Sequence, residues 1–224
     1  DFWSTTNNWD NDAVPVFPAA LTFAGATRLT PSNDLGNVTV TNITFAAGAG
    51  AFALGGGPIT LGGNVSVAIA AGAATNDQAI NFPLTLSASP VLSAALAGGS
   101  TTVGKGLLII NGAISGPFGL TSSGKNYVQL NGVNTYSGDT VISSSSGDGS
   151  FSIGNANAFG SGKVIVGATP GAAQIWLQAV GNLTVTNTFE VRTQRFISAG
   201  YTVGGKTAGN LTLSGNVVLN QGNS

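Results

Sequence analysis

The tetrapeptide Gly-Asn-(Val/Leu)-(Thr/Ser), followed by an aliphatic residue, recurs through this chain of 224 residues and limits its fold more than any other feature. In each copy, a turn that tolerates unusual backbone angles precedes a short strand with alternating faces. Self-similarity of this kind is typical of a solenoid, in which no single unit can bury its apolar face alone. The copies lie at 36–40, 63–67, 181–185 and 209–213, with a shorter echo at 215–219.

The spacing of the copies and the length of the strand-like segments predict a parallel β-helix. The first two copies are 27 residues apart and the third and fourth are 28 apart, within the range of about 20–50 residues for solenoid repeats. Short strands with tight corners suit the turns of such a coil better than a barrel. We therefore predict an all-β β-solenoid with Val, Ile, Leu and Phe inside. The clearest predicted strands are 42–45, 58–61, 82–86, 107–110, 127–130, 140–142, 163–166 and 174–177.

The two ends of the chain differ in composition. Residues 1–20 hold Trp3, Trp9, two phenylalanines and two prolines, and we expect this aromatic segment to cap the first turn, because an uncovered sheet edge invites aggregation. Residues 21–224 are expected to form the β-helical turns. The last residues still follow the repeat pattern, so we expect no cap there. Trp3, Trp9, Val217 and Leu219 are the candidate contacts for assembly at the two ends.

The charge content excludes several classes of partner. Only 7% of residues are charged, and the seven basic residues are scattered, so no basic stripe can neutralise a phosphate backbone and nucleic-acid binding is not expected. No apolar run reaches the roughly 18–20 residues of a membrane helix, so we expect no membrane insertion. The chain has no cysteine, which excludes disulfides and favours an exported bacterial protein.

One segment resembles a known repeat. Residues 130–142 read Leu-Asn-Gly-Val-Asn-Thr-Tyr-Ser-Gly-Asp-Thr-Val-Ile, and residues 153–162 read Ile-Gly-Asn-Ala-Asn-Ala-Phe-Gly-Ser-Gly. Together they resemble the autotransporter-associated β-strand repeat, and the opening residues 3–23 are similar to the start of large bacterial surface proteins built from it. The resemblance implies a right-handed parallel β-helix at the bacterial surface, usually part of a long passenger. The chain departs from the autotransporter pattern in lacking the alternating segments of a membrane barrel.

The acidic residues do not suggest catalysis. Glycoside hydrolysis needs two carboxylates about 5–9.5 Å apart, and we find no pair placed on one face of adjacent turns by its spacing. Histidine is absent, which removes several acid–base arrangements. We therefore expect no enzyme, no catalytic residue and no cofactor, and a polysaccharide-active β-helix enzyme is the distant alternative. The acidic residues are Asp1, Asp10, Asp12, Asp34, Asp77, Asp139, Asp148 and Glu190.

Three further features are candidate sites. The densest charge cluster contains Glu190, Arg192 and Arg195. Strand alternation puts Glu190 and Arg192 on one outer face of a strand, where they form either a solvated ion pair or a surface patch for acidic sugars. The segment 7–12 offers oxygen ligands that suit calcium but lacks EF-hand spacing, so a polar turn is favoured and no metal is expected. Trp176 is a packed strand residue or a sugar-stacking platform.

The Asn-x-(Thr/Ser) triplets at the corners would be glycosylation acceptors in a eukaryotic secretory protein. In a bacterial repeat they favour a structural interpretation: asparagine tolerates left-handed angles and its amide can bond the neighbouring turn. These triplets begin at Asn37, Asn42, Asn64, Asn182 and Asn210.

The sequence thus predicts a secreted or surface-exposed bacterial protein. The favoured function is a non-enzymatic structural segment or subunit of an extracellular fibre, associating end to end or with the rest of a longer chain. An adhesin passenger that binds host or neighbouring cells, including their surface glycans, is the alternative.

Overall fold

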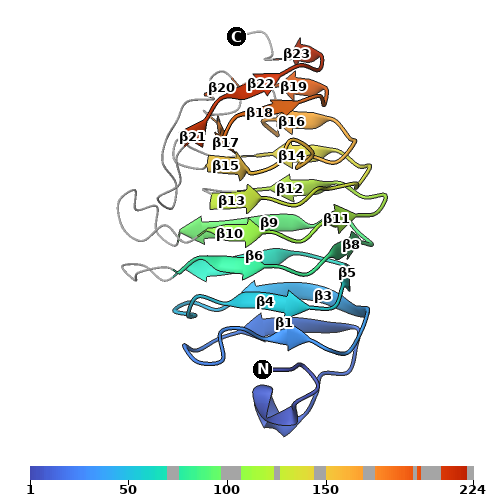
Figure 1. Ribbon diagram of the computed structural model, residues 1–224, viewed down its shortest axis with the longest axis vertical. Coiled ribbons are helices and arrows are strands. Elements are labelled where there is room, and N and C mark those ends of the chain that lie inside the picture. Colours follow the sequence, from blue (N-terminus) through green and yellow to red (C-terminus); the bar gives the residue numbers. More distant parts are fainter. Residues whose placement is uncertain are drawn as a thin grey trace.

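Short parallel strands stack along one axis, so that the chain winds as a β-solenoid with its N-terminal segment at one end and its last strands at the other (Figure 1). The computed structural model describes residues 1–69, 76–96, 107–123, 127–143, 150–168, 175–193, 196–197 and 208–220. Two short 3-10 helices, η1 (Thr6–Asn8) and η2 (Asp10–Asp12), precede the first strand. The predicted all-β parallel fold is confirmed.

A single long strand joins two of the stacks that surround the core. Strand β3 (Val38–Phe45) pairs with β5 through residues 38–40 and with β6 through residues 43–45. The first stack runs from β3 through β5 (Ile59–Leu61), β8 (Leu84–Leu86) and β11 (Ile114–Ser115). The second stack contains β1 (Ala19–Phe23), β3, β6 (Val65–Ile69), β9 (Val91–Leu96), β12 (Leu120–Ser122), β14 (Thr140–Ile142), β16 (Val164–Val166), β19 (Phe189–Val191) and β23 (Val217–Leu219).

A separate sheet forms the third stack. Its strands are β2 (Ser32–Asn33), β4 (Ala53–Gly56), β7 (Gln78–Ile80), β10 (Leu108–Ile110), β13 (Tyr127–Leu130), β15 (Ser150–Ile153), β17 (Ile175–Val180) and β20 (Phe196–Ile197). Strand β21 (Ala208–Gly209) pairs with the end of β17 in the antiparallel sense. Near the C-terminal end, β18 (Leu183–Val185) and β22 (Leu211–Leu213) form a two-stranded parallel sheet. Each predicted strand contains or overlaps one of these elements.

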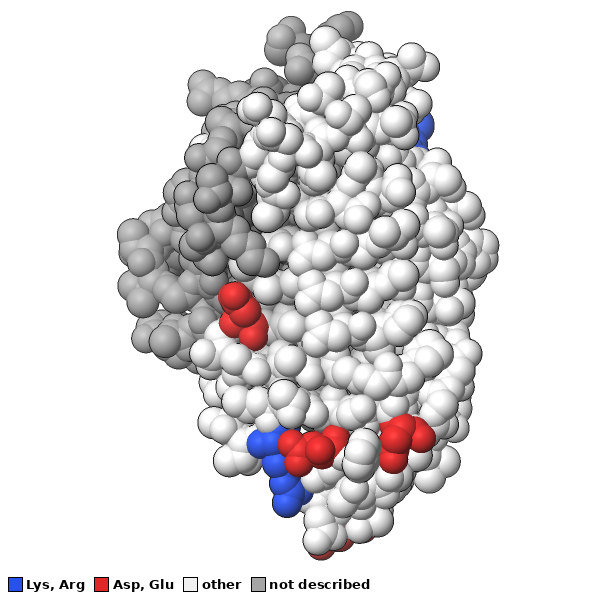
Figure 2. Space-filling model, viewed as in Figure 1, with Lys and Arg blue, Asp and Glu red and all other residues white. Residues whose placement is uncertain are grey.

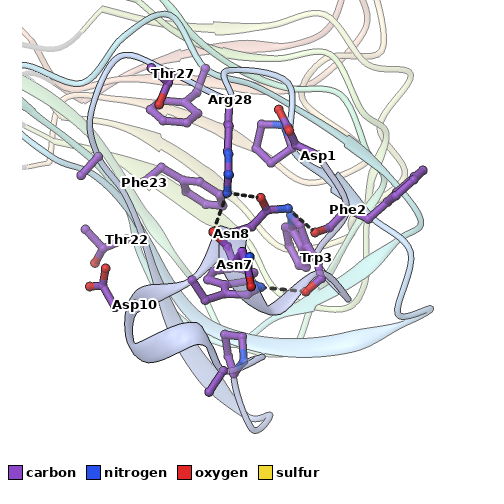
Figure 3. A pocket seen from close by; sticks show the side chains of 16 residues that line it. Asp1, Phe2, Trp3, Asn7, Asn8, Asp10, Thr22, Phe23, Thr27 and Arg28 are labelled. Atoms are coloured by element: carbon purple, nitrogen blue, oxygen red, sulfur yellow. Dashed lines mark hydrogen bonds between the residues drawn. The ribbon is translucent and has the colours of Figure 1, made fainter.

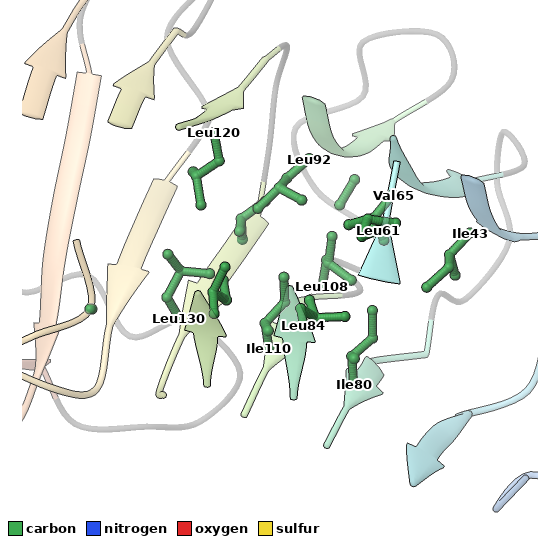
Figure 4. Packing of buried hydrophobic residues seen from close by; sticks show 14 of the residues in the cluster. Ile43, Leu61, Val65, Ile80, Leu84, Leu92, Leu108, Ile110, Leu120 and Leu130 are labelled. Atoms are coloured by element: carbon green, nitrogen blue, oxygen red, sulfur yellow. The ribbon is translucent and has the colours of Figure 1, made fainter. Parts of the chain in front are cut away.

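Alternating side chains build the core as the sequence predicts. In β8, Leu84 and Leu86 are buried while Thr85 is exposed, because successive residues of a strand face opposite sides. Parallel in-register pairing then places the aliphatic residues of one turn beside those of the next: Ile80 pairs with Ile110, and Ile110 pairs with Leu130. Figure 4 shows these side chains meeting those of the facing strands across the interior. Each buried aliphatic side chain stabilises the fold by about 1.5–3 kcal/mol.

The spacing of the Gly-Asn copies predicts the pairing between turns only near the C-terminal end of the solenoid. Copies three and four stack as expected, since Leu183 pairs with Leu211, 28 residues on. Copies one and two do not stack on each other. Residues 38–40 belong to the first stack and residues 65–67 to the second, so the interpretation of their 27-residue spacing as one turn was wrong. The motif marks any corner that leads into a strand, and a turn contains more than one such corner.

The glycine and the asparagine of the motif have separate roles. Gly36 and Gly181 adopt φ values of +80° and +85°, which glycine alone reaches without strain. None of the motif asparagines is left-handed, so that part of the prediction was wrong. The predicted bond to the neighbouring turn is confirmed: Oδ1 of Asn64 accepts the backbone N–H of Val91 at 2.9 Å, and Oδ1 of Asn182 accepts that of Asn210 at 3.0 Å.

The residues of the 130–142 segment also link turns. Asn134 is buried; its Oδ1 accepts the N–H of Ile114 and its Nδ2 donates to the carbonyl of Ala158, so that one side chain bonds the turns before and after its own. Tyr136 is buried, and its hydroxyl lies 2.5 Å from Oγ1 of Thr140. Burial raises the pKa of the Tyr136 phenol. These motif positions therefore serve the fold.

Candidate functional site

The aromatic segment at the N-terminal end packs on the end of the core. Trp3 is 1% exposed and packs edge-on against Trp9 and Phe82 and face-on against Phe17, with ring centroids 5.8–6.5 Å apart. Such aromatic pairs contribute about 0.5–1.5 kcal/mol beyond their buried area. Because Trp3 faces inward, its side chain closes the core and is not presented to a partner. Trp9 is half-buried at the cap surface.

Polar contacts tie the cap to the first turns. The backbone N–H and hydroxyl of Ser4 both donate to the carboxylate of Asp34, at 2.9 and 2.5 Å. These hydrogen bonds favour the charged form and lower the pKa of Asp34. Phe2 forms a parallel bridge with Ser32. The cap is therefore joined to the solenoid by backbone pairing as well as by aromatic packing.

The opposite end presents an apolar strand. Val217 and Leu219 in β23 are 48% and 71% exposed. They pair in register with Phe189 and Val191 of β19, which are buried. Val217 and Leu219 thus continue the inward-facing columns, and no described strand lies beyond them. Among the described residues β23 pairs only with β19, so its outer edge carries backbone N–H and C=O groups without a strand partner.

The charge cluster joins side chains from neighbouring turns of the solenoid. The Glu190 carboxylate accepts from Nε of Arg192 at 2.7 Å, from Nζ of Lys163 at 3.1 Å and from Nδ2 of Asn220 at 3.0 Å. The predicted pairing of Glu190 with Arg192 on one face is confirmed, but Glu190 is 8% exposed and not freely solvated. Arg195 lies outside the described residues. Lys163 and Asn220 were missed; Lys163 lies 27 residues before Glu190, about one turn, which is the signal that could have found it.

The hydrogen bonds to the Glu190 carboxylate predict that the stability of the fold depends on pH. Hydrogen bonds, above all from Arg192, lower the pKa of Glu190 from 4.5 to about 2. A depressed pKa in the folded state stabilises the fold above pH 4.5, and this contribution is lost as the pH falls toward 2. We expect Glu190→Gln to melt at a lower temperature than wild type at pH 7, with the difference in Tm shrinking toward zero at pH 2. Circular dichroism melts at both pH values measure it; a constant difference would contradict the assignment.

Other carboxylates also bond backbone groups of neighbouring turns. Oδ1 of Asp77 accepts the N–H of Leu107, and Oδ1 of Asp139 accepts that of Lys163, both at 2.9 Å. Within the described ranges, no three His, Cys, Asp or Glu side chains are grouped so that they could hold a metal ion. The calcium-like segment 7–12 forms η1 and η2 of the cap. These acidic groups are used to join turns.

Figure 2 shows one face of the molecule, with few charged atoms and most of those toward the N-terminal end. In the described part of the chain, no helix is long and apolar enough to cross a membrane.

Compared with known protein families, with curated protein sequences and with solved structures, the chain matches none of them. The resemblance to the autotransporter-associated repeat stays a prediction from the sequence.

Proposed function

We propose that this chain is a non-enzymatic structural unit of a bacterial extracellular or surface fibre. The observation that carries the proposal is the apolar strand β23, whose Val217 and Leu219 continue the core columns to the end of the stack. A second β-solenoid surface placed there, from another copy or from the rest of a longer chain, would cover both side chains and pair the free edge of the strand.

Two other observations support a mechanical role. The interior is one continuous apolar cluster from Trp3 to Phe189, so neighbouring turns support one another along the axis. Asp34, Asp77, Asp139 and Glu190 bond the cap or adjacent turns. The low charge of the chain, 7% of residues, leaves little electrostatic repulsion between copies.

Sedimentation velocity of end-directed variants tests the proposal. We expect wild-type protein to form species whose sedimentation coefficient rises with concentration, and Leu219→Lys to remain monomeric, because the charge would be buried at the junction without a partner. Val133→Lys is the matched control: Val133 is also exposed but lies outside the end strands, and this variant should assemble like wild type. Equal assembly of all three proteins would refute the role of β23. A wild type that stays monomeric and binds cells would favour the adhesin alternative.

A further inference from the structure

The cap and the first turns line an open pocket of about 680 Å³, within the range of about 300–1,000 Å³ of small-molecule sites. Figure 3 shows its walls converging from the cap, from the end of β1 and from the connection between β1 and β2. The buried rings of Trp3, Phe23 and Phe52 lie beneath the pocket, and the half-buried Trp9 supplies accessible aromatic surface. Polar residues also line the pocket: Asn7, Asn8, Asp10, Thr22, Thr27 and Arg28.

Arg28 is held in an unfavourable backbone conformation. Its φ of +53° lies in the left-handed region, which residues other than Gly, Asn, Asp and His rarely adopt. Strain of this kind is concentrated at binding and catalytic sites. The conformation allows Nη1 of Arg28 to donate to the carbonyl of Asn7 at 2.5 Å and to Oδ1 of Asn8 at 2.6 Å (Figure 3).

The Arg28 guanidinium retains unused donors. Both of its hydrogen bonds use Nη1, and within the described residues neither Nε nor Nη2 has a partner and no carboxylate forms an ion pair with Arg28. Guanidinium has five N–H donors in a rigid fork. Arg28 can therefore donate to a ligand in the pocket without breaking its contacts to the cap.

Hydrogen bonds also hold the Trp9 ring and the Asn8 amide in place before a ligand binds. Nε1 of Trp9 donates to the carbonyl of Trp3 at 2.7 Å, and Nδ2 of Asn8 donates to the carbonyl of Phe2 at 2.7 Å (Figure 3). The half-buried Trp9 ring and the Asn8 amide therefore lose little conformational freedom when a ligand binds. Preorganisation of this kind raises affinity.

We infer that this pocket binds a neutral saccharide. The half-buried Trp9 ring suits the C–H face of a sugar ring, and the rim of the pocket offers both donors and acceptors for the hydroxyls around that ring. Asp1 and Asp10 line the pocket together with Arg28, so the cationic side chain is balanced and a neutral ligand is favoured. The inference does not rest on the proposed fibre, because its observations come from the cap and the first turns and not from β23 (Figure 1).

Titration of the folded protein with the methyl glycosides of glucose, galactose, mannose and N-acetylglucosamine, followed through its tryptophan indole N–H signals, tests the inference. Use of the Leu219→Lys background separates this test from that of assembly. We expect at least one glycoside to shift the Trp9 signal in a saturable manner while the signal of Trp176, in β17, stays in place. Arg28→Asn should weaken binding at least tenfold with only a small change in Tm, since asparagine tolerates the positive φ and the two hydrogen bonds to the cap that are lost are exposed. Asp10→Asn should weaken it several-fold.

Arg192→Asn makes the same change of charge at the other end of the solenoid and is expected to bind like the background protein. The inference is overturned if no glycoside shifts the Trp9 signal, if Arg28→Asn binds with unchanged affinity, or if sodium glucuronate binds and the neutral glycosides do not. The last result would identify an anion site.

Discussion

Replacing Phe159 with alanine is expected to lower the free energy of unfolding by about 3–5 kcal/mol. Phe159 is fully buried, and its ring stacks on Phe151 and meets Phe189 edge-on, with both centroid distances 5.9 Å. Phe151 and Phe159 lie in one turn and Phe189 comes from the next, so truncation removes packing within the turn and between turns and leaves a cavity that rigid neighbouring turns cannot fill. Urea unfolding of wild type and variant measures the difference.

Phe118→Ala is the matched control for this change. Phe118 is 39% exposed, so the same truncation removes less buried area and should change the free energy of unfolding by about 1 kcal/mol or less. Similar losses in the two variants would contradict the placement of Phe159 in the continuous core.

Gly112→Ala is expected to destabilise the protein by about 3 kcal/mol through a close approach between turns. A Cβ atom at this position would meet the carbonyl group of Phe82 and lie 3.1 Å from the backbone nitrogen of Pro83. Those atoms belong to the backbone of the preceding turn, which cannot move without disturbing the strand pairing of β8. The midpoint of urea unfolding reports the effect.

Gly55→Ala provides the comparison for Gly112. Gly55 has no atom near the position of an added Cβ and no positive φ. Alanine should therefore be neutral there or stabilise the protein by about 0.4–1 kcal/mol, because it restricts the unfolded chain. Equal destabilisation of the two variants would mean that contact between turns is not the reason for glycine at 112.

The strands could be predicted because the residue pattern that forms each strand lies within a few consecutive residues. In β5 and β8 the alternation of aliphatic residues and threonine records which face is buried, and glycine or asparagine marks each corner. The register between turns was harder to predict. Residues 38–40 and 65–67 carry the same motif on different stacks, because every corner of a turn has the same need for a tight bend, and the motif does not record which corner it serves.

The candidate sites depend on contacts between turns, which a single motif does not contain. The pairing of Glu190 with Arg192 follows from alternation within β19 and its continuation, but the approach of Lys163 requires the register of one full turn. Arg28 shows the limit most clearly. Its sequence neighbours give no sign of a positive φ, and the pocket that it lines combines the cap with two separate segments of the solenoid.

Negative-stain electron microscopy of the purified chain across a concentration series tests the proposed fibre most directly. The account predicts filaments of solenoid width that lengthen as the protein concentration rises, and that are lost in Leu219→Lys but retained in Val133→Lys. Short single rods of constant length at every concentration would contradict it.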